Sequence, residues 1–428
     1  MRFSLLDKSH PHWPVWRVLL PIGLGTALSL MGDTALYAVL PTHTSAAGIS
    51  LVSVGVILSA NRWIRLITNG TAGVAYDRWP HRWFFVLAMF LGALSTALYA
   101  GTQGFWPLLA ARLLWGLAWS GIWVGGNTII LDVTTAGDRG RWTGLYQFSF
   151  YLGSTLGFPA GGLLTDWLGY HRALSVAAGV TFLGALIALF FLPETRRQKD
   201  EGRRMKDEVP SSSFVLPPST FEGESTARRA SLASATLLYS ANRFVAAGVI
   251  SATLGLLIQQ RWGEVRLAGG APIGVATLTG ALLGLSTLVS MFAAPLAGHW
   301  SDRIQNRWRV AAGGLIPGVL GLGLLAVGHP AVILLGVPLS AIAAGSNQSL
   351  ATALLGDFTA GERRGRALGW MHTFGDLSSA IAPPLAYWIL PWIGLPGIYL
   401  ACAGLLAGMW MWAVQLAQVR LRPKTISL

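Results

Sequence analysis

Apolar runs long enough to cross a lipid bilayer recur along the whole of this 428-residue sequence. A helix needs roughly 20 apolar residues to cross about 30 Å of hydrocarbon, and only short polar breaks separate these runs. Hydrophobic residues make up 53% of the chain and charged residues 11%, which a soluble domain could not bury. We therefore expect an all-α membrane protein with twelve transmembrane helices in two six-helix bundles. Their predicted ranges are 18–40, 51–73, 83–101, 107–131, 143–165, 172–192, 232–258, 274–297, 309–328, 331–355, 367–390 and 394–418.

The net charge of +13 does not indicate a nucleic-acid partner, because the basic residues gather in one set of loops. If the N-terminus is cytoplasmic, 24 of the 31 Lys and Arg residues fall on the cytoplasmic side and four fall within helices. Only Arg172, Arg261 and Arg266 fall on the other side. This asymmetry follows the positive-inside rule and predicts a multi-pass protein of the cell membrane with both termini cytoplasmic. We expect no cleaved signal peptide, because the first apolar run is long enough to span.

The longest polar stretch divides the chain into two halves. Residues 194–231 contain eight basic residues among serines, prolines and acidic residues, which is typical of a flexible linker. We predict an N-terminal half at 1–193, a cytoplasmic linker at 194–231 and a C-terminal half at 232–428. A regulatory role for the linker stays open.

Several kinds of site are not expected. Cys402 is the only cysteine, so the chain has no internal disulfide and a thiol-ligated metal site is not predicted. The sequence contains no phosphate-binding G-x-x-x-x-G-K-[ST] loop and no hydrolase motif of the H-E-x-x-H or G-x-S-x-G kind. We therefore predict neither an enzyme nor a cofactor.

An internal repeat with an offset of 225 residues relates the two halves. Five residues after the second helix recur after the eighth: Gly73, Asp77, Arg78, Arg82 and Trp83 become Gly298, Asp302, Arg303, Arg307 and Trp308. At the same offset, Asp132, Arg139, Gly140, Arg141 and Gly144 recur as Asp357, Arg364, Gly365, Arg366 and Gly369. Parallel repeats of this kind are a transporter architecture.

At these residues the chain resembles the major facilitator superfamily, whose halves each carry a G-x-x-x-D-[RK]-x-G-[RK]-[RK] signature after their second helix. The first copy runs from Gly73 to Arg82, with Pro80 in place of the usual glycine, and the second runs from Gly298 to Arg307. The resemblance covers essentially the whole chain. It implies a transporter of small molecules that works by alternating access, and we expect it to be monomeric.

These loops are expected to form a cytoplasmic gate. Asp77 can accept hydrogen bonds from a neighbouring helix N-terminus, Arg78 can pair with Asp132, and glycine permits close helix packing. The alternative is that the charges only fix topology. The predicted gate residues are Gly73, Asp77, Arg78 and Asp132 in the first half and Gly298, Asp302, Arg303 and Asp357 in the second.

Two looser signatures favour proton-coupled export. Arg112 with Gly116 matches the family's R-x-x-x-G pattern, in which the arginine is implicated in proton coupling. The glycines between Gly144 and Gly162, together with Pro159, nearly reproduce the pattern of the family's antiporters, with the proline one place late. The alternative is that the glycines only let helices approach and the proline only bends one.

Charged side chains within the predicted helices are functional candidates, because an unpaired charge in the membrane is costly. Arg62 and Arg65 share one face of the second helix, and His372 and Asp376 share one face of the eleventh. We expect these stripes to meet in a central cavity. The candidate substrate-binding or proton-coupling residues are Asp33, Arg62, Arg65, Arg112, Asn127, Asn242, Arg243, Asn347, His372 and Asp376.

The roles of these residues follow from their charge. Four arginines against two aspartates predict an electropositive cavity and an anionic substrate, held between Arg62 and Arg243. Asp33 is the expected proton carrier, Asp376 with His372 is the alternative, and a structural role for either aspartate stays open. The fourth helix also carries three tryptophans at a spacing of four residues: Trp115, Trp119 and Trp123. They either form an aromatic wall for the substrate or face lipid, and we favour the lipid-facing interpretation.

The sequence thus predicts a secondary transporter that exports a small organic molecule, anionic or amphiphilic, in exchange for protons. One alternative is a proton symporter that takes up an organic anion. Another is a non-transporting membrane sensor or assembly factor on the same fold.

Overall fold

The computed structural model describes residues 13–135, 138–195, 222–263, 265–266, 272–359 and 361–419, and nearly all of them are helical. The N-terminal bundle contains α1 (Val15–Val39), α3 (Leu51–Arg78), α4 (His81–Gly101), α5 (Phe105–Val133), α6 (Arg139–Leu168) and α7 (Tyr170–Phe191), with the short α2 (Thr44–Ala47) after α1. The C-terminal bundle contains α9 (Glu222–Arg243), η1 (Phe244–Ile250) and α10 (Ser251–Arg261), which form one continuous rod, and then α11 (Val275–Ile304), α12 (Arg307–Val327), α13 (Pro330–Asp357) and α14 (Gly361–Val419). Strands β1 (Val265–Arg266) and β2 (Pro272–Ile273) pair antiparallel between α10 and α11.

Ten helical stretches are long and apolar enough to cross a membrane. One of them, Ala367–Gln418 in α14, makes two passes, because the helix turns at Gly394 with a φ of +64° that glycine adopts without strain. Helix α6 is not among the ten, since glycines and polar residues lower its hydropathy, and it packs against both α1 and α11. With α6 and the two arms of α14, the predicted twelve-helix fold is confirmed.

The seventh transmembrane helix differs from the prediction in two ways. It begins at Glu222, so residues 222–231 of the predicted linker are helical. In the sequence these first turns contain mostly polar residues, which the prediction assigned to the linker. Its middle, η1, is a π-helix, which no residue pattern in the sequence predicts. The remaining part of the predicted linker, 196–221, lies outside the described residues.

The two bundles pack closely at the end away from the predicted cytoplasmic loops. There α3 meets α14 where Gly55 lies against Pro383, and α6 meets α11 where Gly280 lies against Phe158. A methyl group at either glycine would overlap the facing carbonyl, so the backbones are in contact.

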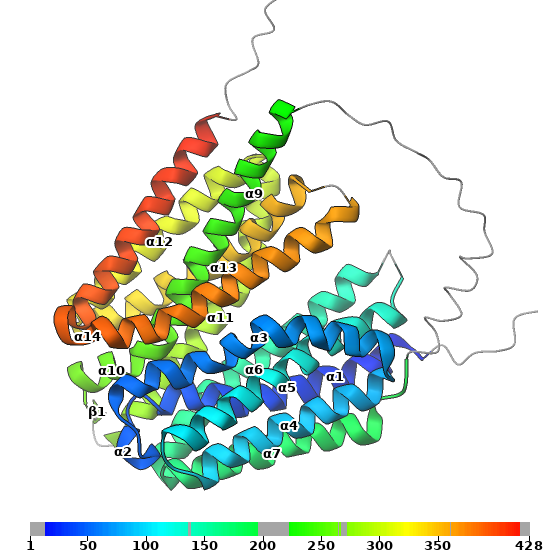
Figure 1. Ribbon diagram of the computed structural model, residues 1–428. Coiled ribbons are helices and arrows are strands. Elements are labelled where there is room, and N and C mark those ends of the chain that lie inside the picture. The colour runs from blue at the N-terminus through cyan, green and yellow to red at the C-terminus, as the bar shows by residue number, and fades with distance from the viewer. Residues whose placement is uncertain are drawn as a thin grey trace, which may run out of the picture.

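The same four helices are apart at the predicted cytoplasmic end. A methyl group at any of four repeat-related glycines would meet no atom of the described residues within 4 Å: Gly73, Gly144, Gly298 and Gly369. Figure 1 shows the bundles close together near α2, α10 and the turn of α14, and diverging from there. The conformation is therefore open toward the predicted cytoplasmic end, and the expected close packing at Gly73 and Gly298 is wrong for this state.

Candidate functional site

One carboxylate joins two arginines from opposite bundles at the level where the bundles begin to diverge. Arg65 of α3 donates from Nη2 to Oδ1 of Asp376 at 2.9 Å. Arg243, the last residue of α9, donates from Nη2 to the same oxygen at 3.2 Å. One turn before Asp376, Nδ1 of His372 lies 2.9 Å from the hydroxyl of Tyr239. The polar stripes predicted on the second and eleventh helices therefore meet, and two cations share one anion there.

Arg62 lies one turn closer to the packed end and binds backbone. Its Nη1 donates to the carbonyl of Ser379 at 3.0 Å and its Nη2 to the carbonyl of Ala247 at 2.7 Å. The side chain of Arg62 is 6% exposed, and both of its terminal nitrogens are hydrogen-bonded. In this conformation the pair that flanks a carboxylate is Arg65 with Arg243, and the substrate clamp of Arg62 with Arg243 stays a prediction.

The other intramembrane acid is sealed within the N-terminal bundle. Arg112 of α5 donates from Nη1 to Oδ1 of Asp33 on α1, and the arginine side chain is fully buried. Arg112, rather than an arginine of the second helix, is thus the partner of Asp33. Its Nε and Nη2 have no partner among the described residues. The guanidinium therefore keeps donors that can reorganise if Asp33 is protonated.

Tyr37 connects the buried pair to the contact between the bundles. The guanidinium carbon of Arg112 lies 4.8 Å from the centre of the Tyr37 ring, and that of Arg62 lies 5.4 Å from it. The tyrosine hydroxyl donates to the carbonyl of Leu58 at 3.2 Å, which fixes the ring. A cation close to an aromatic ring interacts with the quadrupole of the ring, so Tyr37 is a shared neighbour of both arginines.

An aromatic stack runs along α5 inside the N-terminal bundle. The ring centres of Trp115 and Trp119 are 6.1 Å apart, and those of Trp119 and Trp123 are 5.8 Å apart, with nearly parallel planes. Phe150 of α6 packs against both Trp119 and Trp123. Trp115 is 1% exposed and Trp119 is 7% exposed, so the favoured lipid-facing interpretation is wrong. The sequence could not distinguish the two faces, because tryptophan is suited to either.

The three candidate amides differ in what they bind. Asn242 donates to the carbonyl of Ala344 at 2.8 Å and joins α9 to α13. Asn127 and Asn347 donate to carbonyls of their own helices, at 2.7 and 3.0 Å. Oδ1 of the fully buried Asn347 has no partner among the described residues. Of the three, Asn242 is the one that links helices.

The first gate cluster is built around Asp132. Its Oδ2 lies 2.6 Å from Nδ1 of His81 and accepts a hydrogen bond from the hydroxyl of Thr195 at 3.0 Å. Nε2 of His81 faces the carbonyl of Tyr76 at 2.7 Å, and a carbonyl can only accept. Nε2 must therefore donate, and the contact of Nδ1 with Asp132 needs a second proton, carried by the imidazolium or by the acid. The proposed pairing of Arg78 with Asp132 stays a prediction.

The second gate cluster uses a different arginine from the one expected. Arg307 donates from Nε to Oδ2 of Asp357 at 2.7 Å and from Nη1 to Oδ1 of Asp302 at 3.2 Å. Arg307, and not Arg303, therefore pairs with Asp357 and Asp302. The reason is geometric: Arg307 opens α12, whereas Arg303 lies in the last turn of α11.

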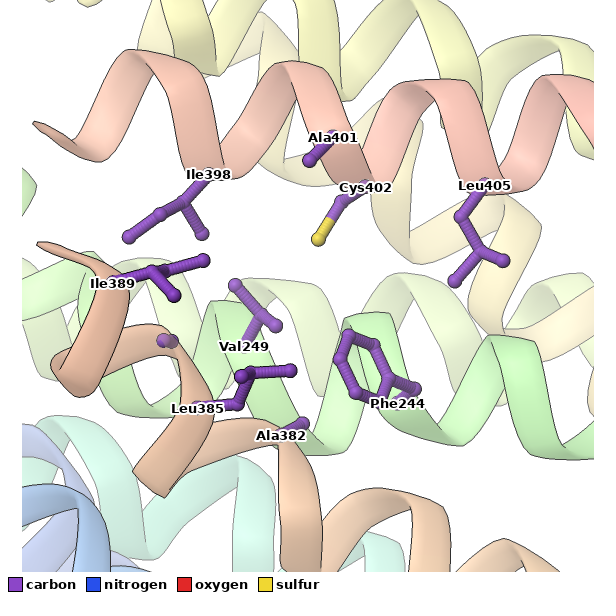
Figure 2. Close-up of a pocket in the computed structure, with 10 residues that line it drawn as sticks. Phe244, Val249, Ala382, Leu385, Ile389, Ile398, Ala401, Cys402 and Leu405 are labelled. Carbon is purple, nitrogen blue, oxygen red and sulfur yellow. The ribbon is translucent and has the colours of Figure 1, made fainter. Parts of the chain in front are cut away.

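A separate apolar cavity of about 120 Å³ lies within the C-terminal bundle. Figure 2 shows it between η1, which contributes Phe244 and Val249, and the two arms of α14, which contribute Leu385 and Cys402 among others. Its lining carries no charged side chain, so it suits neither an anion nor a proton carrier. Within the described ranges, no group of three His, Cys, Asp or Glu side chains could hold a metal ion.

The family model of the Major Facilitator Superfamily matches residues 22–277 and 232–426. A probable 4-methylmuconolactone transporter from Cupriavidus pinatubonensis is 30% identical over 175 residues, which are 41% of either chain. The multidrug resistance protein MdtG from Salmonella choleraesuis is 24% identical over 356 residues, 82% of this chain and 81% of the relative. The chain matches less than half of the length of several of its curated relatives, including the 4-methylmuconolactone transporter.

Solved structures share the fold. An inward-facing, occupied bacterial homolog of the human lysosomal transporter Spinster has a TM-score of 0.72 at 14% identity, with 96% of both chains covered. A peptide transporter POT has a TM-score of 0.73 at 13% identity, with 94% of both chains covered. Together with the family model and the twelve-helix repeat, these similarities show that the chain belongs to the major facilitator superfamily of secondary transporters.

Proposed function

We propose that this transporter exports small organic anions with an apolar, ring-bearing body in exchange for protons. The observation that carries the proposal is the pair Arg65 and Arg243, which come from opposite bundles and share the single carboxylate of Asp376. Two guanidinium groups around one carboxylate leave an excess of positive charge. A substrate carboxylate can replace Asp376 between them, because arginine binds carboxylates through two parallel hydrogen bonds.

The aromatic residues of α5 and α6 support a ring-bearing substrate. Trp119, Trp123 and Phe150 pack together, and the last two are only partly buried, so their rings are the aromatic surface that we propose for the substrate. Relatives are named for transport of 4-methylmuconolactone and 4-hydroxybenzoate and for resistance to tetracycline. Such compounds combine a ring with polar oxygen groups, which suits an aromatic surface beside a cationic one.

Asp33 is the proposed proton carrier. Its carboxylate is neutralised by Arg112 within one bundle, so protonation of Asp33 would release the guanidinium without separating the bundles. The freed charge would then act on Tyr37 and, through it, on Arg62. Protonation inside the N-terminal bundle is in this way linked to the contact between bundles.

We further propose that the protein is a monomer in the cell membrane with both termini cytoplasmic. The distribution of basic residues supports this orientation. Both bundles of an alternating-access unit are present in one chain, so a partner is not needed to complete it.

Proton symport of an organic anion is the second candidate. It stays open because the antiporter-like segment of α6 has a packing role: Pro159 and the carbonyl of Phe158 lie against Gly280 of α11. The antiporter-like sequence therefore serves a close helix contact, which either direction of transport can use.

Flux in proteoliposomes tests these proposals. With labelled 4-hydroxybenzoate outside, an acidic interior should drive uptake if the protein is an antiporter, and an acidic exterior should drive it if the protein is a symporter. Passive weak-acid leak accumulates the compound on the alkaline side, so it opposes the antiport signal, and protein-free liposomes measure it. The neutral methyl ester is the matched probe and should not bind. Preference for the ester or for cationic compounds would contradict the anion proposal.

A further inference from the structure

The two carbonyls that bind Arg62 belong to places where the helices of the C-terminal bundle break their own hydrogen-bonding pattern. An α-helical carbonyl normally accepts from the N–H four residues later, and an extra donor then has little to add. At both acceptors of Arg62, this regular partner is missing or displaced.

The first acceptor is the carbonyl of Ser379 in α14. Its regular partner would be the N–H of residue 383, which is Pro383 and has none. The next residue, Pro384, withdraws the partner of Ala380 in the same way. Nη1 of Arg62 donates to the first of these two carbonyls, that of Ser379, at 3.0 Å.

The second acceptor is the carbonyl of Ala247 in the π-helix η1. The N–H of Ser251 would be its α-helical partner, but this N–H points to the carbonyl of Ala246, five residues back. The Ser251 hydroxyl donates to Ala247 at 2.6 Å, and Arg62 donates to it at 2.7 Å. The π-helix therefore turns a carbonyl toward the other bundle.

Close packing brings the two defects within reach of a single guanidinium. Gly248 of η1 lies against Ala382 of α14, and Gly55 of α3 lies against Pro383, two turns from Arg62 on the same helix. A planar guanidinium can donate to both carbonyls at once, whereas the ammonium of a lysine has no such fixed fork.

Arg62 occupies the boundary between the packed and the open part of the interface. On one side α3 and α14 are in backbone contact at Gly55 and Pro383, and on the other side Gly73 and Gly369 face open space. When the outer side opens, α3 must move away from α14, and both hydrogen bonds of Arg62 must break.

We propose that Pro383 and the π-helix η1 are positioning features that expose these two carbonyls, so that Arg62 holds the bundles in the state open toward the predicted cytoplasmic end. Arg62 thereby controls the balance between the two access states. The inference rests on the alternating-access cycle of the proposed function, but on neither its substrate nor its coupling ion.

The critical variant is Pro383→Ala, with Pro384→Ala as its matched control. Both substitutions restore an N–H to α14 and remove the same ring, but only the first gives Ser379 back its helical partner. We expect Pro383→Ala to move the ratio of the two access states by about threefold to tenfold toward outward opening, as for a weakened hydrogen bond to a charged group. Pro384→Ala should change the ratio by less than about twofold.

The ratio can be measured from the distance between two spin labels, by double electron–electron resonance on the substrate-free protein in nanodiscs. Labels at Val74 and Trp370, on the exposed ends of α3 and α14, report the opening directly in a Cys402→Ser background. An equal shift in both proline variants, or none in Pro383→Ala, would overturn the proposal. Because no substrate or proton gradient is used, failure of the anion or antiport proposals does not affect this result.

A double-mutant cycle separates the role of Arg62 from general stiffening of α14. In an Arg62→Met background, Pro383→Ala should cause no further shift, because the guanidinium that it acts through is gone. An additive shift would overturn the proposal. If Pro383→Ala does not fold, Arg62→Met is compared with Arg309→Met, a change of an exposed arginine near the start of α12. Only Arg62→Met should favour outward opening, and no shift in Arg62→Met would reject the inference.

Discussion

The two halves share one helical arrangement, but their acidic residues have different partners. In the N-terminal half, Asp33 is paired within its own bundle with Arg112, and the gate acid Asp132 is paired with His81. In the C-terminal half, Asp376 is shared with Arg65 of the other bundle, and the gate acid Asp357 is paired with Arg307. Asp132 and Asp357 are equivalent positions of the repeat, so their partners have diverged.

This difference separates two tasks. A pair within one bundle moves with that bundle, so it need not break as the two bundles rock. A pair between bundles must form and break as they rock, so it responds to whatever binds in the cavity. The N-terminal half thus suits proton coupling, and the C-terminal acid suits competition with substrate.

The largest effect is expected for Asp33→Asn. The amide cannot exchange a proton, so pH-driven accumulation in proteoliposomes should be abolished, while substrate exchange without a gradient should persist. Labelled 4-hydroxybenzoate flux with and without an imposed pH gradient measures both activities.

Asp138→Asn provides the control for Asp33→Asn. Asp138 lies in the loop before α6, where hydrogen bonds from Thr135 hold the pKa of its carboxyl below the usual value. It therefore stays ionised at assay pH, and its substitution should leave coupling unchanged. Full gradient-driven accumulation by Asp33→Asn would move the proton to Asp376 or to the substrate.

A smaller effect of unusual sign is expected for Asp376→Asn. Removing the competing carboxylate leaves Arg65 and Arg243 for the substrate, so aromatic carboxylates should bind about tenfold more tightly and turn over more slowly. The methyl ester should still not bind. Calorimetric titration of both compounds measures this, and weaker carboxylate binding would show that Asp376 does not compete.

Arg243→Lys should act in the opposite direction. Lysine keeps the charge but loses the planar fork, so carboxylate binding should weaken by about tenfold. Arg309→Lys, a basic position near the start of α12, is the control and should bind normally. Unchanged affinity in Arg243→Lys would leave this arginine as a structural or coupling residue.

Sequence alone could predict the helices and which acids and bases lie in the membrane, because hydropathy and helical spacing decide both. It also predicted that the stripes containing Arg65 and Asp376 face each other. It could not predict that Arg62 binds backbone, since this depends on a π-helix and on the exact register of Pro383 against α3. Nor could spacing decide between Arg303 and Arg307, which lie on opposite sides of one turn.

The smallest effect concerns the gate acids and would sharpen the contrast between halves. The His81–Asp132 contact requires a proton that the Arg307–Asp357 contact does not. Because the contact requires a bound proton, the stability that it contributes falls as the pH rises. Only the N-terminal gate cluster should therefore weaken in alkaline solution.

Asp132→Asn removes this requirement, because an amide N–H can donate to Nδ1 of a neutral His81 whose Nε2 still donates to Tyr76. Between about pH 6 and about pH 9, the melting temperature of the parent protein should fall by roughly 2 to 4 °C more than that of Asp132→Asn. The repeat-related variant Asp357→Asn should keep the parent's pH dependence, although we expect its overall stability to be lower because the pair with Arg307 is weakened. Thermal unfolding of the three purified proteins measures the difference. If Asp132→Asn retains the parent's slope, the shared proton lies elsewhere and the two gate clusters are electrostatically alike.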